Sequence, residues 1–199
     1  ALRFTMFFNN VLGRPQKKHI ISRHDAYHGS TFLASSCSGK ERDKSYMDFE
    51  ENFVHLLPSP NTYRRPEGMS VEDFCEAKVR DLEDKILELG ADKVAAFIAE
   101  PILASGGVIM PPEGYHAKCA SVCRQHDVLY ISDEVVTGFG RLGHFFASKD
   151  VFNVDADIIT SAKGLTSGYQ PLGAVLINER VLSQVSSEEF SDAVFSSGF

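Results

Sequence analysis

Three charged side chains each follow a short apolar run in this sequence, and their types suggest carbonyl chemistry. These side chains are Glu100, Asp133 (with Glu134 next to it) and Lys163. A lysine amine can form a Schiff base with an aldehyde, and a carboxylate can keep a pyridine nitrogen protonated. Taken singly, such a lysine is usually a solvated charge and such an aspartate a turn former. Their combination is harder to explain in that way.

A flat ring bound by these groups would also need a side chain against each of its faces. Tyr27 follows another short apolar run, His19–Ser22, and can supply one face. Val135 lies two residues after Asp133, so in extended backbone both side chains point the same way. Val135 can therefore supply the other face.

The elements that carry these residues indicate an α/β fold. The apolar runs are continuous rather than alternating, as expected for strands covered on both faces. They alternate with helical periodicity, clearest in residues 71–89 between a capping-box start at Ser70 and Gly90. This pattern predicts a mostly parallel sheet with helices on both faces, whose ligand crevice lies outside the carboxyl ends of the strands. The charged residues should therefore meet at one edge of the sheet.

The remaining elements are expected from the same signals. Strands are predicted over 19–22, 94–99, 128–132, 156–161 and 172–177. Further helices are predicted over 2–12 and 114–126, from Ser30 or Thr31, and from Glu179. Residues 38–69 show little periodicity and contain Pro58, Pro60 and Pro66, so they are expected to form a long surface excursion.

Composition narrows the class of protein. The 199 residues carry a formal net charge of -7 and are 43% hydrophobic, which is typical of a globular chain. The sequence pI of about 5.5 argues against binding to nucleic acid. No run of about 18 apolar residues predicts a membrane span. The four cysteines form no C-x-x-C pair and no metal-ligand cluster, so we expect no metal and a reducing, cytoplasmic compartment.

Several segments of the sequence resemble motifs of one known family. They are Ala26 to Thr31, Ile98 to Pro101, Gly106 to Val108 with Pro111 to Tyr115, Ser132 to Arg141, Ala162 to Tyr169, and Pro171 to Ala174. Together they resemble the class III pyridoxal-5′-phosphate-dependent aminotransferases of fold type I, nearest to the ω-amino acid:pyruvate transaminase branch. The resemblance covers essentially the whole chain, and ordered motifs at matching separations are more specific than one isolated pattern.

The resemblance implies a role for each candidate residue. Lys163 carries pyridoxal 5′-phosphate (PLP) as a Schiff base and then moves the proton between substrate and cofactor, and Asp133 bonds the pyridinium nitrogen. The other implied cofactor contacts surround the ring: Tyr27 and Val135 on its faces, His28 and Gly29 in the wall beside Tyr27, and Glu100 near its hydroxyl group.

The resemblance also implies an organisation larger than this sequence. Residues 1–199 correspond to part of the large PLP-binding domain, which is incomplete here: an N-terminal segment with a phosphate-binding turn and a C-terminal small domain lie outside. The chain lacks an initiator methionine, and both ends look cut. The substrates implied are an amine or ω-amino acid and a keto acid such as pyruvate. A homodimer is implied, with residues 38–69 and 137–143 as candidates for its interface.

Three alternatives remain open at this stage. An aminomutase, decarboxylase or racemase of the same fold would share Lys163 and Asp133. The chain alone would also be an inactive fragment if the missing phosphate contacts carry much of the cofactor affinity. A nucleotide-binding α/β enzyme is disfavoured, because neither G-x-G-x-x-G after a strand nor G-x-x-x-x-G-K-[ST] occurs.

Overall fold

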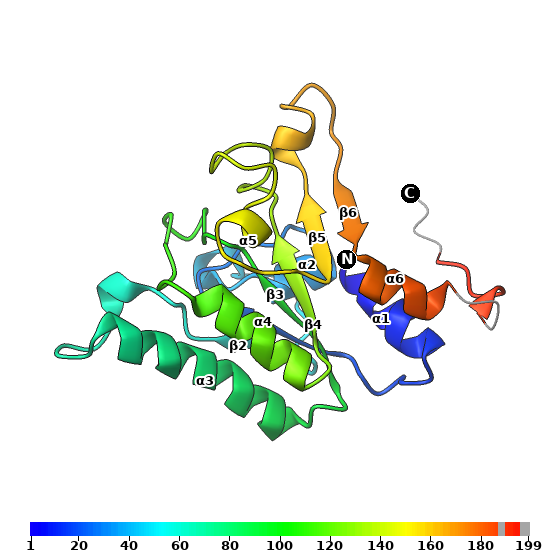
Figure 1. The fold of residues 1–199 in the computed structure, drawn as a ribbon, viewed down its shortest axis with the longest axis horizontal. Coiled ribbons are helices and arrows are strands. Elements are labelled where there is room, and N and C mark those ends of the chain that lie inside the picture. The colour runs from blue at the N-terminus through cyan, green and yellow to red at the C-terminus, as the bar shows by residue number, and fades with distance from the viewer. Residues whose placement is uncertain (187–189, 196–199) are drawn as a thin grey trace.

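A six-stranded sheet forms the centre of the computed structural model, which describes residues 1–186 and 190–195. Its strands run in the order β2-β1-β3-β4-β5-β6 (Figure 1). Their bounds are β1 (His19–Arg23), β2 (Val54–Leu57), β3 (Val94–Ala99), β4 (Leu129–Asp133), β5 (Ile158–Ser161) and β6 (Ala174–Ile177). The first five are parallel and β6 is antiparallel to β5, which confirms the mostly parallel sheet.

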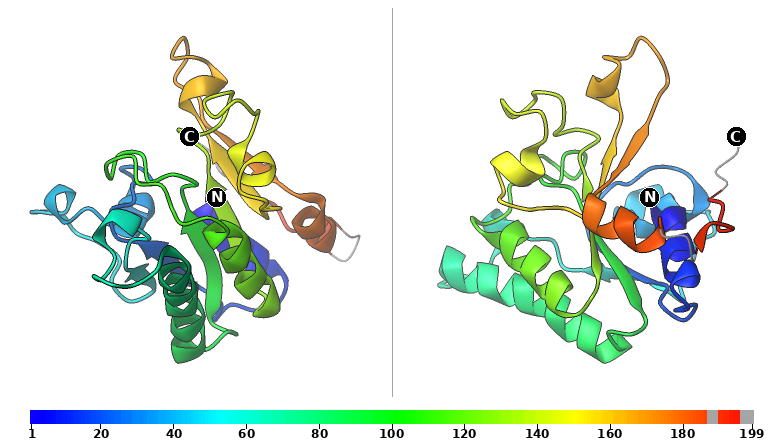
Figure 2. Two further views of the ribbon diagram at one scale, coloured as in Figure 1. Left: turned by 60° about the vertical axis from the view of Figure 1, so that its left-hand side comes forward. Right: turned by 45° about the vertical axis from the view of Figure 1, so that its right-hand side comes forward.

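Helices cover both faces of this sheet, as the sequence predicts. On one side lie α3 (Val71–Leu89) and α4 (Tyr115–Gln125), and on the other lie α1 (Leu2–Val11), α2 (Phe32–Cys37) and α6 (Glu179–Val185) (Figure 2). Short elements connect them: α5 (Ala147–Asp150), η1 (Glu41–Asp43), η2 (Thr62–Arg64) and η3 (Lys163–Leu165). The central strand β3 is buried along its whole length because it contributes side chains to both cores, Phe97 to the α3/α4 side and Ile98 to the other.

The residues at the two ends of α3, the longest helix, explain where it begins and ends. At its start, the Ser70 hydroxyl accepts a hydrogen bond from the backbone N–H of Asp73 at 2.9 Å. At its end, Gly90 has φ +91°, which favours glycine. Between them, the apolar side chains recur on the face that packs against α4 and the sheet. The predicted helix over 71–89 is therefore confirmed.

The structure corrects one prediction about the fold. Residues 38–69 are not entirely a surface excursion, because Val54–Leu57 form the edge strand β2, paired in parallel with β1. This strand is only four residues long and half-buried, and Pro58 follows it at once, so its apolar signal is weak. An edge strand needs only one covered face and one partner, and it therefore lacks the continuous apolar run of β3.

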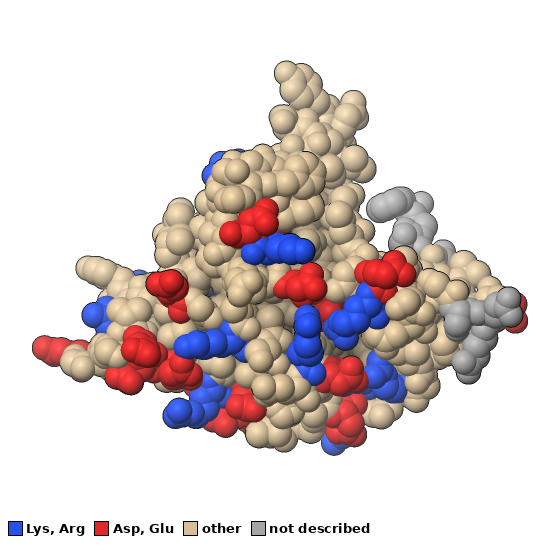
Figure 3. Space-filling view, in the orientation of Figure 1, with Lys and Arg blue, Asp and Glu red and all other residues tan. Residues whose placement is uncertain are grey.

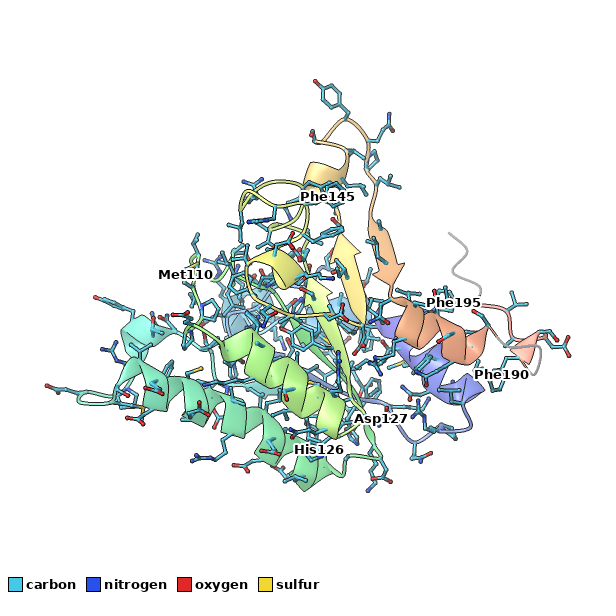
Figure 4. The ribbon with its side chains drawn as sticks, viewed as in Figure 1. Met110, His126, Asp127, Phe145, Phe190 and Phe195 are labelled. Carbon is cyan, nitrogen blue, oxygen red and sulfur yellow. The ribbon has the colours of Figure 1, made fainter. Side chains whose placement is uncertain are left out.

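Two ends of the sheet differ in character. Loops rise from the carboxyl ends of β4 and β5, with Phe145 among them, whereas His126 and Asp127 lie at the opposite end (Figure 4). Figure 3 shows charged side chains of both signs mixed over the half of the molecule that α3 and α4 cover. The projecting segment between β5 and β6 contains no charged residue after Lys163.

None of the helices in the described part of the chain has the length and apolar character needed to span a bilayer.

Candidate active site

One cavity of about 500 Å³ opens at the carboxyl ends of β3, β4 and β5, beside the loop that follows β1. All of the residues that the sequence predicts around a cofactor line it: Tyr27, His28, Gly29, Glu100, Asp133, Val135 and Lys163. Ala104, Ser105 and Val136 complete the lining and were not predicted. The structure thus brings together residues separated by up to 136 positions along the chain.

Asp133 is held by His28 at the edge of this cavity. The Nδ1 atom of His28 lies 2.7 Å from Asp133 Oδ2, and both side chains are almost entirely buried. Burial alone would raise the pKa of Asp133, but the hydrogen bond and charge of His28 and the backbone N–H of Val135 together hold this pKa below its usual value. An ionised carboxylate only accepts hydrogen bonds, so Nδ1 carries the hydrogen. Asp133 is therefore kept as an anion.

The other ring nitrogen of His28 lies 3.1 Å from Ser22 Oγ. Ser22, His28 and Asp133 thus form a hydrogen-bonded series that is similar in order to the catalytic triad of a serine hydrolase. Ser22 is fully buried and does not line the cavity, so its hydroxyl cannot reach a substrate. The serine fixes the orientation of the imidazole ring.

Val135 reaches the cavity by a different route from the predicted one. The strand β4 ends at Asp133, and residues 135–140 form turns, so Val135 is not in extended backbone. Instead, Asp133 Oδ1 accepts a hydrogen bond from the backbone N–H of Val135 at 3.2 Å. The aspartate side chain that faces the cavity therefore also sets the turn that brings Val135 there.

Glu134 is separated from its neighbour Asp133 by the direction of its side chain. It is fully buried and accepts hydrogen bonds from Thr137 Oγ1 at 2.9 Å and from the backbone N–H groups of Ala147 and Ser148 at 2.8 and 2.6 Å. These contacts tie the loop after β4 to the start of α5. The adjacent acids therefore have different functions, one in the cavity and one in the scaffold.

Glu100 joins two walls of the cavity. Its Oε1 atom accepts a hydrogen bond from the backbone N–H of Tyr27 at 2.9 Å, and Oε2 accepts one from Ala104 at 3.1 Å. Burial raises the pKa of Glu100 above its usual value, even though the neighbouring His28 acts in the opposite direction. Glu100 thus positions the loop that carries Tyr27.

A buried polar network supports Glu100 from below. Arg23 Nη2 donates to the backbone carbonyl of Glu100 at 2.6 Å, and His116 Nε2 donates to the next carbonyl, that of Pro101, at 3.0 Å. The Tyr130 hydroxyl donates to His116 Nδ1 at 2.7 Å. Burial and the charge of Arg23 lower the pKa of His116 to about 3, so its ring is neutral. The sequence alone did not predict this network. Only Arg23 could have drawn attention, because it is a charged residue at the end of an apolar strand.

Lys163 lies on a tight turn directly after β5. Its φ is +32°, a backbone conformation that is costly for any residue except glycine. The next residue is Gly164, where an added Cβ would lie only 2.9 Å from Phe139 Cβ. The turn therefore packs closely against the loop after β4 and presents the lysine to the cavity.

In the two described ranges, 1–186 and 190–195, no three His, Cys, Asp or Glu side chains are grouped to hold a metal ion. The four cysteines are buried free thiols. The cavity offers the amine of Lys163, the carboxylates of Asp133 and Glu100, the His28 imidazole, the Ser105 hydroxyl and otherwise apolar or aromatic walls.

Several known proteins are similar to this chain in sequence and in fold. Residues 1–195 match the aminotransferase class-III family. The chain is 43% identical over its full length to a vanillin aminotransferase of Capsicum frutescens, of which it covers 43%, and 40% identical to a probable gamma-aminobutyrate transaminase 4 of Oryza sativa subsp. japonica, of which it covers 41%. It superposes over its full length, with a TM-score of 0.93 and 38% identity, on 44% of a thermostable (S)-enantioselective omega-transaminase from Thermomicrobium roseum. The chain thus spans about two fifths of the length of these relatives.

Proposed function

The chain belongs to the class III aminotransferase family, and on that premise we propose that it supplies the ring-binding part of a PLP-dependent transaminase site. The reaction would move an amino group from an amine or ω-amino acid to a keto acid such as pyruvate. The observation that carries this proposal is the meeting of Lys163 and an ionised Asp133 in one cavity with Tyr27 and Val135.

The donor set of the cavity fits this cofactor. A pyridinium nitrogen needs an anionic partner, and Asp133 is held as one by His28. An aldehyde needs a primary amine, and Lys163 is the lysine that lines the cavity. A planar ring needs flat or branched walls, which Tyr27 and Val135 supply. When bound, the cofactor supplies an aldehyde that reacts with amines and a ring that accepts electrons from the substrate carbon.

Each of the polar residues around the cavity then has a specific role. Lys163 would hold the cofactor covalently and, once the substrate amine replaces it, would move a proton at its Nζ atom. Asp133 would keep the ring nitrogen protonated, and His28 would keep Asp133 ionised. Glu100 would position Tyr27 through its backbone N–H rather than by touching the reacting atoms.

The complete enzyme would be larger than this chain. Because the chain spans about two fifths of its relatives, we propose that residues 1–199 are part of a large PLP-binding domain, completed by segments before and after it. We also propose a homodimer. Exposed apolar side chains on the loops at the carboxyl edge, Phe145, Tyr169 and Leu172, support a contact there.

Amino transfer is distinguished from the other reactions of this fold by its second substrate. With the complete natural protein, alanine should form from pyruvate only when an amine donor is present, and the donor should be consumed in equal amount. A racemised, rearranged or decarboxylated product that appears without any keto acid would instead identify one of the alternatives.

A further inference from the structure

Thr160, on strand β5, lies next to Asp133 in the sheet. The strands β4 and β5 are parallel neighbours, and Asp133 and Thr160 are partners in their register (Figure 1). Ile131 and Ile158, two positions earlier in each strand, are also partners, and both pack in the core that α1, α2 and α6 cover. Side chains two positions apart in a strand point to the same face. The side chains of Asp133 and Thr160 therefore project from the same face of the sheet, side by side.

The Thr160 hydroxyl is closed off from solvent without a hydrogen bond of its own. Its Oγ1 atom is buried, and within the described part of the chain no group bonds to it with good geometry. The backbone of Thr160 is paired, because its carbonyl accepts a hydrogen bond from the N–H of Glu134 at 2.9 Å. Buried hydroxyls are seldom left unpaired, since the loss of water is then uncompensated. The carboxylate of Asp133 is within reach, and the hydroxyl contributes to the lowered pKa of that carboxylate.

The carboxylate of Asp133 has acceptor positions left for this hydroxyl. Its Oδ2 atom lies 2.7 Å from His28 Nδ1, and its Oδ1 atom accepts a longer hydrogen bond from the backbone N–H of Val135 at 3.2 Å. The two oxygens of a carboxylate offer about four lone-pair positions. A hydroxyl hydrogen rotates to suit its acceptor, so that of Thr160 can turn toward the carboxylate.

We propose that the Thr160 hydroxyl donates a hydrogen bond to the Asp133 carboxylate and so adds to the support that His28 gives to the anion. The inference rests on the proposed function, in which that anion is the partner of the cofactor ring nitrogen. A hydrogen bond to a charged acceptor is stronger than one to a neutral acceptor, so this contact favours the ionised form. Thr160 does not line the cavity, and it is therefore a positioning residue that acts through Asp133.

Three titratable side chains face Asp133 from the other elements around the cavity. His28 approaches from the loop after β1, Glu100 from the end of β3, and Lys163 from the turn after β5. A substitution at Thr160 leaves all three in place. A changed titration of Asp133 in such a variant is therefore due to the lost hydroxyl.

The test measures the affinity of the complete natural protein for PLP after removal of its cofactor, by equilibrium titration down to the pH range in which carboxyl groups titrate. Protonation of Asp133 removes the partner of the ring nitrogen, so the affinity should fall below a midpoint pH. In Thr160→Val this midpoint should rise by about one pH unit, because one lost hydrogen bond to a charged group shifts the ionisation equilibrium about tenfold. A PLP analogue with a C–H group in place of the ring nitrogen should show no such rise.

Further variants separate the hydroxyl from the rest of the side chain. Thr160→Ser keeps a hydroxyl and should keep the midpoint of the unaltered protein, whereas Thr160→Ala should give the same rise as Thr160→Val. Ser161→Ala is the matched control. It removes a buried hydroxyl that also lacks a partner among the described residues but belongs to the opposite face of the sheet, and it should leave the midpoint unchanged. Melting temperatures of the cofactor-free variants show that each is folded.

Three results would overturn the inference. They are an unchanged midpoint in Thr160→Val and Thr160→Ala, an equal rise in Ser161→Ala, or a Thr160→Ser protein that behaves like Thr160→Val. Failure of the proposed function has a different signature. The unaltered protein would then bind PLP no more tightly than the analogue, and Asp133→Asn would not change the ratio of the two affinities.

Discussion

His28 Nδ1 and Asp133 Oδ2 lie 2.7 Å apart at the edge of the cavity, and their side chains are 1% and 6% exposed. This contact joins the loop after β1 to the end of β4. It reverses the effect of burial on the carboxyl group, because without a partner a buried aspartate would favour its neutral form. The imidazole therefore decides whether Asp133 can serve as the anionic partner of a ring nitrogen.

Replacing His28 with Gln should move the acid limb of the pH–activity profile to higher pH. The pKa of Asp133 is depressed in the folded protein, so its ionised form persists as pH falls until that low pKa is reached. Without the imidazole, burial dominates and the pKa of Asp133 rises. Activity that depends on the anion is then lost earlier during acidification. A profile of kcat/KM with the same acid limb as the unaltered protein would contradict this role.

Replacing each of the adjacent acids Asp133 and Glu134 by its amide should affect a different property of the protein. The Asp133 variant should lose activity, and the Glu134 variant should lose stability. Asp133→Asn removes the anion from the cavity and should lower kcat/KM by about 10²–10⁴-fold, with a small change in the melting temperature. Glu134→Gln weakens a buried acceptor of several hydrogen bonds and should destabilise the fold by about 1–3 kcal/mol. Steady-state kinetics and urea denaturation of both variants check this. Equal loss of activity and stability in the two would show that the side chains are not divided as described.

Gly164→Ala should disturb the turn that presents Lys163. The added methyl group would meet Phe139 Cβ at 2.9 Å, so the turn or the loop after β4 must shift, at a cost of about 1–3 kcal/mol. Gly173→Ala on the same hairpin is the control, because its nearest contact is Ser161 O at 3.6 Å. We expect PLP affinity to fall in the first variant only. If Phe139→Gly, which removes the opposing Cβ, does not partly restore the Gly164→Ala protein, the contact is not the cause.

Much of this site follows from the sequence because parallel strands bring their carboxyl ends to one edge. Glu100, Asp133 and Lys163 each follow an apolar strand, and that position alone brings them to one edge of the sheet. Val135 was placed in the site for the wrong reason, since a side-chain turn rather than strand alternation brings it there. The strand β2 was missed because four half-buried residues give little signal.

The supporting contacts were not predictable in the same way. Arg23 donates to a carbonyl 77 residues away and His116 to one 15 residues away, and neither spacing has a local signature. Lys40 lies in a segment without periodicity, so the position of its Nζ atom, 5.8 Å from the centre of the Tyr27 ring, became visible only in three dimensions. Such contacts depend on the tertiary arrangement of loops, which hydrophobic patterning does not specify.

Acidification should destabilise the protein partly through His116. The folded ring binds a proton only near pH 3, whereas in the unfolded chain it binds one near pH 6.5. Between these values the unfolded state holds the extra proton, so stability falls as pH is lowered through this window. His116→Gln removes this titration and should be less stable at pH 7 but show a shallower decline from pH 6.5 to 4. Urea denaturation across this range measures both slopes, and parallel slopes would contradict a neutral buried ring.

The central claim is that Lys163 carries the cofactor, and absorption spectroscopy with PLP tests it most directly. The complete natural protein should show a near-visible absorption band with PLP. Reduction with borohydride should then attach the cofactor permanently to Lys163, and mass analysis of the peptides would locate the modified residue. Lys163→Ala should abolish this band, whereas Lys149→Ala, at an exposed lysine on α5, should retain it. A band that survives in Lys163→Ala, or that borohydride fixes on another lysine, would contradict the account.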